Sequence, residues 1–205
     1  MDNKFNLKFY STTRKIVRVA FKGIFRPKIN GLENIQNTGA SLFIGNHRSL
    51  LDVPLLVTTV EEPIHLMAKQ ELFNIPVLAA FFSKMGAIPI DRNSKKNRIK
   101  AALMARRRLK NGCSVGIFPE ATRNKYNKDL PFEPVAKLAT VTNNKIIPFA
   151  ISGKYRIGGG ITISFGEPLE NETLKKLDQD ADYLVKRRVK SLQLYNTRQR
   201  KRVRF

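Results

Sequence analysis

The stretch Ala40-Ser41-Leu42-Phe43-Ile44-Gly45-Asn46-His47-Arg48-Ser49-Leu50-Leu51-Asp52 holds the transition on which the fold depends. Its apolar first five residues predict a buried strand. Residues 50–60 predict a helix, with Ser49 as a candidate N-cap. A buried strand that passes through a short polar turn into a helix is the building unit of a layered α/β protein.

The turn also places a histidine close to a carboxylate. Five residues at about 100° each put His47 and Asp52 about 140° apart on an ideal helix, so two helical positions could not meet. They can meet if His47 lies on the turn and Asp52 in the first turn of the helix. The carboxylate then holds one ring nitrogen and the other can take a proton, which is a general-base arrangement. The alternative is that His47 only caps the helix and Asp52 is a solvated acid favoured by the helix dipole.

Length and composition limit the classes of protein. A chain of 205 residues with 42% hydrophobic content can bury one sizeable core and is not disordered throughout. The single cysteine, Cys113, excludes an internal disulfide framework and suits a reducing compartment. Two histidines and one cysteine, widely spaced, form no recognisable metal-binding pattern, so we expect no metal. We expect no other cofactor either.

The net charge of +22 indicates an anionic partner. Nucleic acid, an anionic membrane surface, and acidic substrates or carrier proteins all fit, and composition does not choose among them.

Residues 4–26 predict an amphipathic basic helix. Apolar residues from Ile16 to Ile24 share one face, whereas Arg14, Arg18 and Lys22 follow at four-residue steps on another. This pattern suits a helix in the membrane interface, and equally a helix packed on the domain with a solvated basic face. The longest uncharged stretch near mid-chain, residues 72–83, is shorter than the roughly 20 residues needed to span a bilayer, and basic residues interrupt any signal-peptide core.

After Pro27, short apolar runs alternate with helical patterns. The predicted strands are 42–44, 64–68, 87–90, 115–118, 146–151 and 161–165, and the predicted helices are 50–60, 76–82, 94–110 and 132–143. The alternation predicts an α/β layered domain with a mostly parallel mixed sheet flanked by helices, preceded by the N-terminal amphipathic helix. We divide the chain into 1–27 as a membrane-interface segment, 28–184 as the main domain and 185–205 as a basic tail that is solvated or partly disordered.

Two more motifs place charged residues where predicted strands end. Gly86-Ala87-Ile88-Pro89-Ile90-Asp91-Arg92 ends in an arginine that can grip a phosphate, although a surface turn is the simpler interpretation. Phe118-Pro119-Glu120-Ala121-Thr122-Arg123 brings a carboxylate, a hydroxyl and a guanidinium to one loop. His65, on the predicted strand 64–68, is expected to be structural.

The order of these motifs resembles one family. NHRSLLD at 46–52, GAIPIDR at 86–92, FPEATR at 118–123 and IIPFA at 146–150 are similar, in order and separation, to the motifs of the 1-acyl-glycerol-3-phosphate acyltransferases. The resemblance covers roughly residues 30–155. One departure is Ala121, which stands where the family motif has glycine and leaves the identity of the acceptor lipid open.

The resemblance implies that His47 is the general base and that Asp52 orients it. It also implies that Arg92, Glu120 and Arg123 hold the glycerol-phosphate acceptor, with Lys69 at a frequently basic position near the site. We add Thr122 to these acceptor-binding candidates because its hydroxyl can donate to phosphate from the same loop.

The implied reaction moves an acyl group from a coenzyme A or acyl-carrier-protein thioester to the free sn-2 hydroxyl of lysophosphatidic acid, giving phosphatidic acid. The enzyme would work at the cytoplasmic face of the cell membrane, as a peripheral or monotopic protein on an anionic surface. Three alternatives remain: the same chemistry on another lysolipid or glycerol-3-phosphate, a basic nucleic-acid-binding protein, for which we find no recognised module, and an inactive scaffold on a lipid surface.

Overall fold

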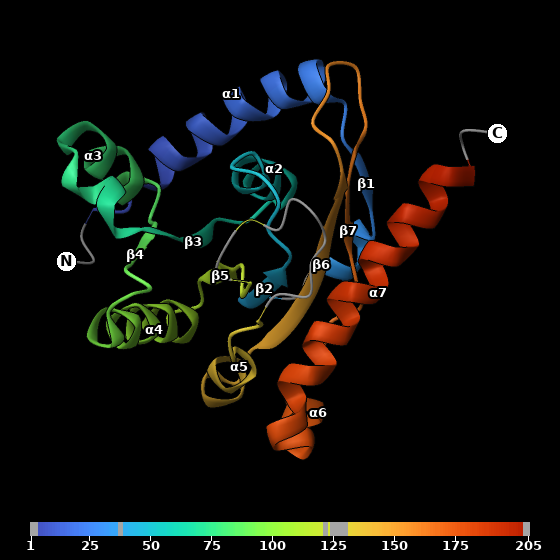
Figure 1. Ribbon diagram of the computed structural model, residues 1–205. Helices are drawn as coiled ribbons and strands as arrows, with labels where there is room; N and C mark the ends of the chain where they lie inside the picture. The colour runs from blue at the N-terminus through green and yellow to red at the C-terminus, as the bar shows by residue number, and fades with distance from the viewer. Residues whose placement is uncertain (1–3, 37–38, 121–122, 124–130, 203–205) are drawn as a thin grey trace.

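The computed structural model describes residues 4–36, 39–120, 123 and 131–202 (Figure 1). Its centre is a seven-stranded sheet in the order β1-β7-β6-β2-β5-β3-β4. Every neighbouring pair is parallel except the antiparallel hairpin β6–β7, so the expected mostly parallel mixed sheet is confirmed. The strands are β1 Lys28–Asn30, β2 Ser41–Gly45, β3 Ile64–Lys69, β4 Ile88–Ile90, β5 Ser114–Ile117, β6 Lys145–Gly153 and β7 Ile161–Phe165.

Helices cover both faces of the sheet. The α-helices are α1 Leu7–Phe25, α2 Asp52–Thr59, α3 Pro76–Lys84, α4 Lys95–Lys110, α5 Ala136–Thr142, α6 Asn171–Leu177 and α7 Ala181–Arg202; short 3-10 turns occupy Leu32–Ile35, Gln70–Asn74 and Asp178–Asp180. Figure 1 shows α1 and α2 on one side of the sheet and α4, α5 and α7 on the other. The two hydrophobic cores follow this division, since alternate residues of β2 enter different cores: Leu42 and Ile44 pack with α4 and α7, and Phe43 packs with α1 and α2.

Helix α1 begins and ends at local signals. The side chain of Asn6 accepts a hydrogen bond from the backbone N–H of Phe9, and Arg26 adopts a left-handed conformation (φ 42°) just before Pro27. The expected amphipathic helix is confirmed, but only some of its apolar side chains face the domain, and others face away from it. Phe21 is buried against the domain, whereas Ile16 is largely exposed.

Helix α7 corrects the expectation of a solvated tail after residue 185. Ala181, Val185 and Val189, spaced four residues apart, are buried in the core beneath the sheet. Further along, the buried Asn196 accepts a hydrogen bond from Ser164 and donates one to the backbone carbonyl of Ala150. The high charge of this segment concealed an apolar stripe, and the boundary drawn at residue 184 falls within one helix.

Candidate active site

Four parallel strands bring the predicted site residues to one edge of the sheet. β5 lies between β2 and β3, with Ile44 opposite Ile117 and Leu66 opposite Gly116. β4 then pairs with β3, with Lys69 opposite Ile90. The segments that carry His47, Glu120, Lys69 and Arg92 therefore leave the sheet at the same carboxyl-terminal edge, where open α/β sheets bind ligands.

His47 and Asp52 form the pair that the sequence predicted. His47 lies on the turn after β2, Asp52 is the first residue of α2, and Nδ1 of His47 is 3.0 Å from Oδ2 of Asp52. The same oxygen accepts the backbone N–H groups of Arg48 and Ser49. The carboxylate favours the tautomer in which Nδ1 carries the proton and donates it in this hydrogen bond. In that tautomer Nε2 has a free lone pair that can take a proton.

The start of α2 differs from the expectation. Ser49 is not the N-cap, because the helix begins at Asp52 and the cap position is Leu51. Ser49 instead builds the preceding turn, in which its backbone carbonyl accepts the N–H of Asp52 and its hydroxyl accepts the N–H of Leu51. This turn folds His47 back over the helix, so that the fully buried Asp52 can reach it.

A tyrosine that the sequence did not indicate completes the environment of Asp52. The hydroxyl of Tyr155 donates a hydrogen bond of 2.7 Å to Oδ1 of Asp52, 103 residues away in sequence. Burial raises the pKa of Tyr155, and the charge of Asp52 and the hydrogen bond to it raise it further. The phenol is therefore a protonated donor. A single tyrosine beyond the end of β6 carries no sequence signal for this role.

Asn46 fixes the origin of the turn. Its side-chain amide donates to the backbone carbonyl of Ile151 at 2.9 Å, and its carbonyl oxygen accepts the N–H of Ile151 at 2.8 Å. The buried asparagine thus continues the pairing of β2 with β6 by one residue, through its side chain. The guanidinium of Arg48 adds a bond to the carbonyl of Gly153. Both contacts hold the histidine turn against the strand that leads to Tyr155.

The third motif meets the first through aromatic stacking. The ring of Phe118 lies against the imidazole of His47, and it also makes an edge-to-face contact with the buried ring of Phe149. Glu120 follows Phe118 by two residues and is half-buried, and Arg123 is exposed. Thr122 lies outside the described residues, as does Ala121. The exit loop of β5 therefore begins directly beside His47.

Arg92 and Lys69 have contrasting surroundings. Arg92 is half-buried just beyond β4, where burial lowers the pKa of its guanidinium and the carboxylate of Glu133 partly offsets the effect. Lys69 is exposed and forms a surface ion pair of 2.8 Å with Glu71. Lys69 is thus at the expected edge, but its ammonium group is engaged with a neighbour on the surface.

His65 has the structural role that we expected. It is buried, its Nδ1 lies 2.8 Å from the backbone carbonyl of Gly86, and its ring meets the edge of Phe5. Among the residues that the structure describes, no group of three or more histidine, cysteine, aspartate or glutamate side chains is arranged to hold a metal ion. Across the same residues, every helix is too short or too polar to cross a bilayer.

Fold and site together define a three-layer α/β protein with a histidine–aspartate pair at the carboxyl-terminal edge of its sheet. A family model described as Acyltransferase matches residues 26–152, and the chain belongs to this family.

Named relatives agree with this assignment. The 1-acyl-sn-glycerol-3-phosphate acyltransferase of Bacillus subtilis is 31% identical over 170 residues, which cover 79% of this chain and 81% of that protein. That of Helicobacter pylori is 36% identical over 123 residues, covering 59% of this chain and 52% of that protein. The crystal structure of the 1-acyl-sn-glycerophosphate (LPA) acyltransferase PlsC from Thermotoga maritima superposes with a TM-score of 0.67 at 25% identity, covering 89% of this chain and 79% of that one. The chain spans about half the length of several curated relatives, 43% to 52% of four of them, the Helicobacter pylori protein included.

Proposed function

We propose that this chain is an O-acyltransferase that moves a fatty acyl group from a thioester to the free sn-2 hydroxyl of 1-acyl-glycerol-3-phosphate. The observation that carries the proposal is the contact between Nδ1 of His47 and the buried carboxylate of Asp52 at the edge of the sheet. Relatives named as acyltransferases for this acceptor support the choice of substrate.

In the proposed reaction, Nε2 of His47 takes the proton of the acceptor hydroxyl while the oxygen attacks the thioester carbonyl carbon. The carbon–sulfur bond breaks, and the imidazolium returns the proton to the departing thiolate. Asp52 keeps the imidazole in the tautomer that this step needs and stabilises its charged form. The hydroxyl of the acceptor is the nucleophile, so neither an enzyme-bound acyl intermediate nor a cofactor enters the scheme.

The acceptor phosphate needs cationic groups at the same edge. Arg92 and Arg123 are our candidates, because arginine offers paired donors to phosphate oxygens. The partly buried position of Arg92 favours an anionic ligand, since burial already disfavours its isolated charge. Glu120 is assigned to a hydroxyl of the acceptor and Thr122 to its phosphate, with Lys69 in a peripheral position.

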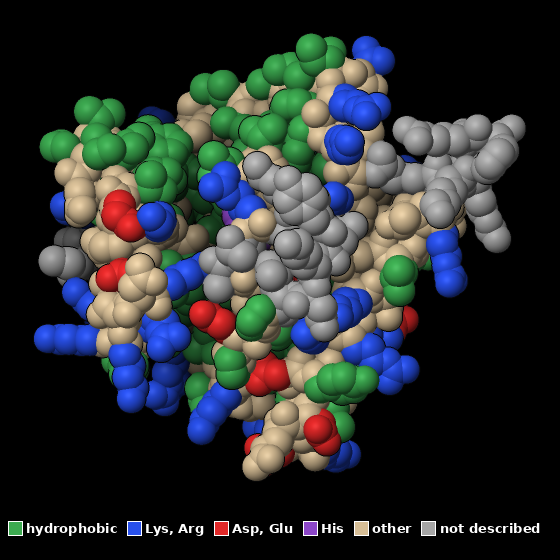
Figure 2. Space-filling view, viewed as in Figure 1, with side chains coloured by type: hydrophobic (Ala, Val, Ile, Leu, Met, Phe, Trp, Pro, Cys, Tyr) green, Lys and Arg blue, Asp and Glu red, His purple; other side chains and the backbone are tan. Residues whose placement is uncertain are grey.

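We place the enzyme on the cytoplasmic face of the membrane, bound through an apolar surface around α1. This surface consists of the exposed residues Leu7, Ile16, Val19 and Ile24 of α1, Ile75, Val77 and Phe81 at α3, and Ile157 in the β6–β7 hairpin. Phe9 joins α1 to Phe81 of α3, and the N–H of Gly158 in the hairpin donates to the carbonyl of Ile24. Figure 2 shows the hydrophobic side chains gathered over α1 and α3.

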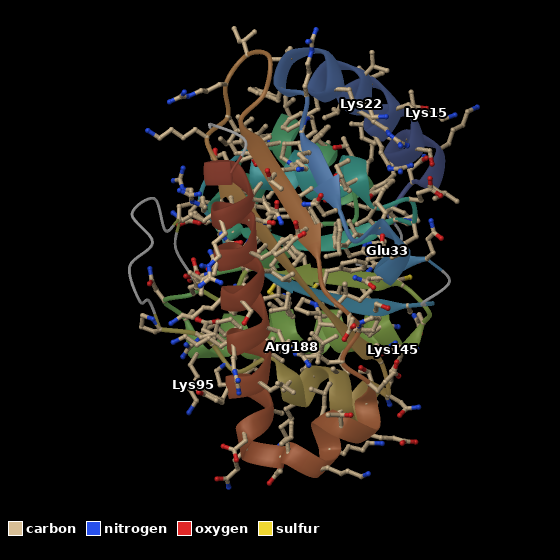
Figure 3. All side chains as sticks on the ribbon, turned by 90° about the vertical axis from the view of Figure 1, so that its right-hand side faces the viewer. Lys15, Lys22, Glu33, Lys95, Lys145 and Arg188 are labelled. Atoms are coloured by element: carbon tan, nitrogen blue, oxygen red, sulfur yellow. The ribbon has the colours of Figure 1, made fainter. Side chains whose placement is uncertain are left out.

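Basic residues border this apolar surface. Lys15 and Lys22 project from α1 near the top of Figure 3. An exposed apolar stripe flanked by lysines is the composition of a helix that lies in a bilayer interface, with its cations at the anionic headgroups. The amphiphilic acceptor would then reach the site from the membrane.

The acyl donor is proposed to be a thioester of coenzyme A or of an acidic acyl carrier protein. Helix α4 carries eight basic residues and no acidic one, and it lies on the face of the sheet opposite α1. Its exposed cations therefore remain available to a negatively charged donor when α1 rests on the bilayer.

The test uses purified protein with lysophosphatidic acid in anionic vesicles and both classes of thioester. We expect phosphatidic acid with at least one donor. Competition with glycerol-3-phosphate and with phosphate-free lysolipids separates the proposed acceptor from the alternatives. Arg123→Ala should raise the apparent KM for the phosphorylated acceptor, and an unchanged KM would contradict its role at the phosphate. Failure to form product with either donor would overturn the proposed function.

A further inference from the structure

The two oxygens of the Asp52 carboxylate are held from different parts of the chain. Oδ2 receives His47 and two backbone N–H groups, all from within five residues. Oδ1 receives the hydroxyl of Tyr155, which comes from the loop beyond β6. The local turn thus holds Oδ2. The position of Oδ1, and with it the orientation of the carboxylate plane, depends on Tyr155, which only the tertiary fold brings near.

Tyr155 is itself held by α1. Its ring meets Phe21 and Phe25 edge-on, with centroids 6.2 Å and 5.5 Å away and both interplanar angles at 82°. The hydrogen bond from Gly158 to Ile24 ties the same hairpin to the last turn of α1. Edge-to-face pairs of this kind are directional contacts, so these rings fix the direction of the phenol.

The surroundings of Tyr155 combine a charge and two rings. Arg48, on the histidine turn, is a cation that acts on Tyr155, and α1 contributes the rings of Phe21 and Phe25. The raised pKa of Tyr155 keeps its hydroxyl protonated, so it remains a donor to the carboxylate throughout the range in which a histidine works as a base.

We propose that Tyr155 is a positioning residue for His47, acting through Asp52, and that the end of α1 holds Tyr155 in place. The expected effect on kcat rests on the proposed function, whereas the expected effect on the orientation of His47 does not. Without the phenol, Oδ1 loses its donor and the carboxylate can turn about its last side-chain bond, so that Nδ1 of His47 is held less firmly. Proton acceptance by Nε2 then suffers, whereas substrate binding does not.

The experiment compares Tyr155→Phe with the unaltered protein, using Tyr183→Phe on the exposed side of α7 as the matched control. Protein labelled with ¹⁵N-histidine contains only two rings, His47 and His65, so each can be followed by NMR. We expect Tyr155→Phe to shift the ring nitrogens of His47 toward a mixture of tautomers and to leave those of His65 unchanged. Tyr183→Phe should move neither.

The kinetic readout separates positioning from binding. With Tyr155→Phe we expect kcat to fall about tenfold at unchanged KM for both substrates, which is the effect of losing one hydrogen bond to a charged group. An unaltered His47 spectrum together with an unaltered kcat would overturn the inference. If the unaltered protein forms no product, the proposed function fails while the spectra still decide the role of Tyr155.

A second variant addresses the support from α1 and guards against a Tyr155→Phe protein that does not fold. Phe25→Leu keeps every polar atom of the site and changes only the ring packing around Tyr155. We expect a smaller shift of the His47 signals in the same direction, and no additional shift when Phe25→Leu is combined with Tyr155→Phe. Unchanged signals in Phe25→Leu, or additive shifts in the double variant, would contradict the connection through α1.

Discussion

The ring of Phe118 stacks on the imidazole of His47, with 4.4 Å between the ring centroids and 27° between their planes. This contact joins the ends of two neighbouring strands, β2 and β5. It closes one side of the imidazole, while Asp52 holds one of its edges. The motifs at residues 46–52 and 118–123 therefore meet in one site, because the ring of Phe118 touches the imidazole of His47.

Replacing His47 with alanine should remove acyl transfer almost entirely. A positioned general base contributes about 10² to 10⁴ in rate, so we expect kcat to fall within that range while KM for both substrates changes little. Initial rates over a range of donor and acceptor concentrations give both quantities. A His47→Ala protein that retained its turnover would rule out His47 as the base, and circular dichroism of the same sample establishes that the fold is intact.

Asp52→Asn should damage both catalysis and stability. Both oxygens of the Asp52 carboxylate accept hydrogen bonds, from donors of His47, Arg48, Ser49 and Tyr155. In asparagine the NH₂ group replaces one of these oxygens, so a donor faces another donor. We expect the free energy of unfolding to drop by about 1–3 kcal/mol, the cost of leaving buried polar groups unpaired. We also expect kcat to fall at least as far as in Tyr155→Phe. Urea unfolding and steady-state kinetics measure the two effects, and a variant as stable as the unaltered protein would contradict the hydrogen-bond assignment.

Gly86→Ala, in the motif at residues 86–92, should destabilise the protein. Gly86 has φ +73°, and a Cβ atom there would collide with the ring of His65. Gly112→Ala is the matched control, because Gly112 has φ +74° and open space around the same position. Left-handed backbone costs alanine about 1 kcal/mol or more in either variant. We expect the unfolding temperature to fall clearly further in Gly86→Ala than in Gly112→Ala. Equal decreases would show that the ring of His65 can move away from the added methyl group without loss of stability.

Glu62→Gln should stabilise the protein at neutral pH. Burial raises the pKa of Glu62, and the hydrogen bond from Ser114 opposes this only in part. The native state therefore binds more protons than the unfolded chain just above the ordinary pKa of a glutamate, and stability falls as pH rises through that window. Glutamine keeps an acceptor for Ser114 without the half-buried charge. Urea unfolding should show a gain at neutral pH that shrinks at mildly acidic pH; a pH-independent difference would contradict the raised pKa.

Most elements of the sheet were predictable because their signals are local. The runs around residues 42–44, 64–68 and 146–151 are apolar and short, and each became a strand of the expected sheet. Strand β1 was missed because Lys28–Asn30 has no apolar run and is defined only by its pairing with β7. Helix α5 begins at Ala136 rather than at residue 132, since Asp182 of α7 accepts the N–H groups of Val135 and Ala136.

The site divides in the same way. The pairing of His47 with Asp52 was predictable because five residues of sequence limit where the two can meet, and the structure confirms the geometry. Asn46 and Phe118 stood within the recognised motifs, but no spacing rule indicated their contacts with Ile151 and His47. The basic tail misled the prediction, because its charges are obvious in sequence and its buried stripe is not.

The sequence by itself determined the alternation of strands and helices, the histidine–aspartate turn and the charged residues at strand ends. Each depends on interactions within a few residues or on simple periodicity. Only the tertiary structure decided that Tyr155 reaches Asp52, that α1 holds Tyr155, and that α7 covers the sheet. The contacts of Tyr155 join residues more than 100 positions apart in sequence, such as Phe21 and Tyr155. Their partners are chosen by the packing of the completed sheet, because no local pattern links such distant residues.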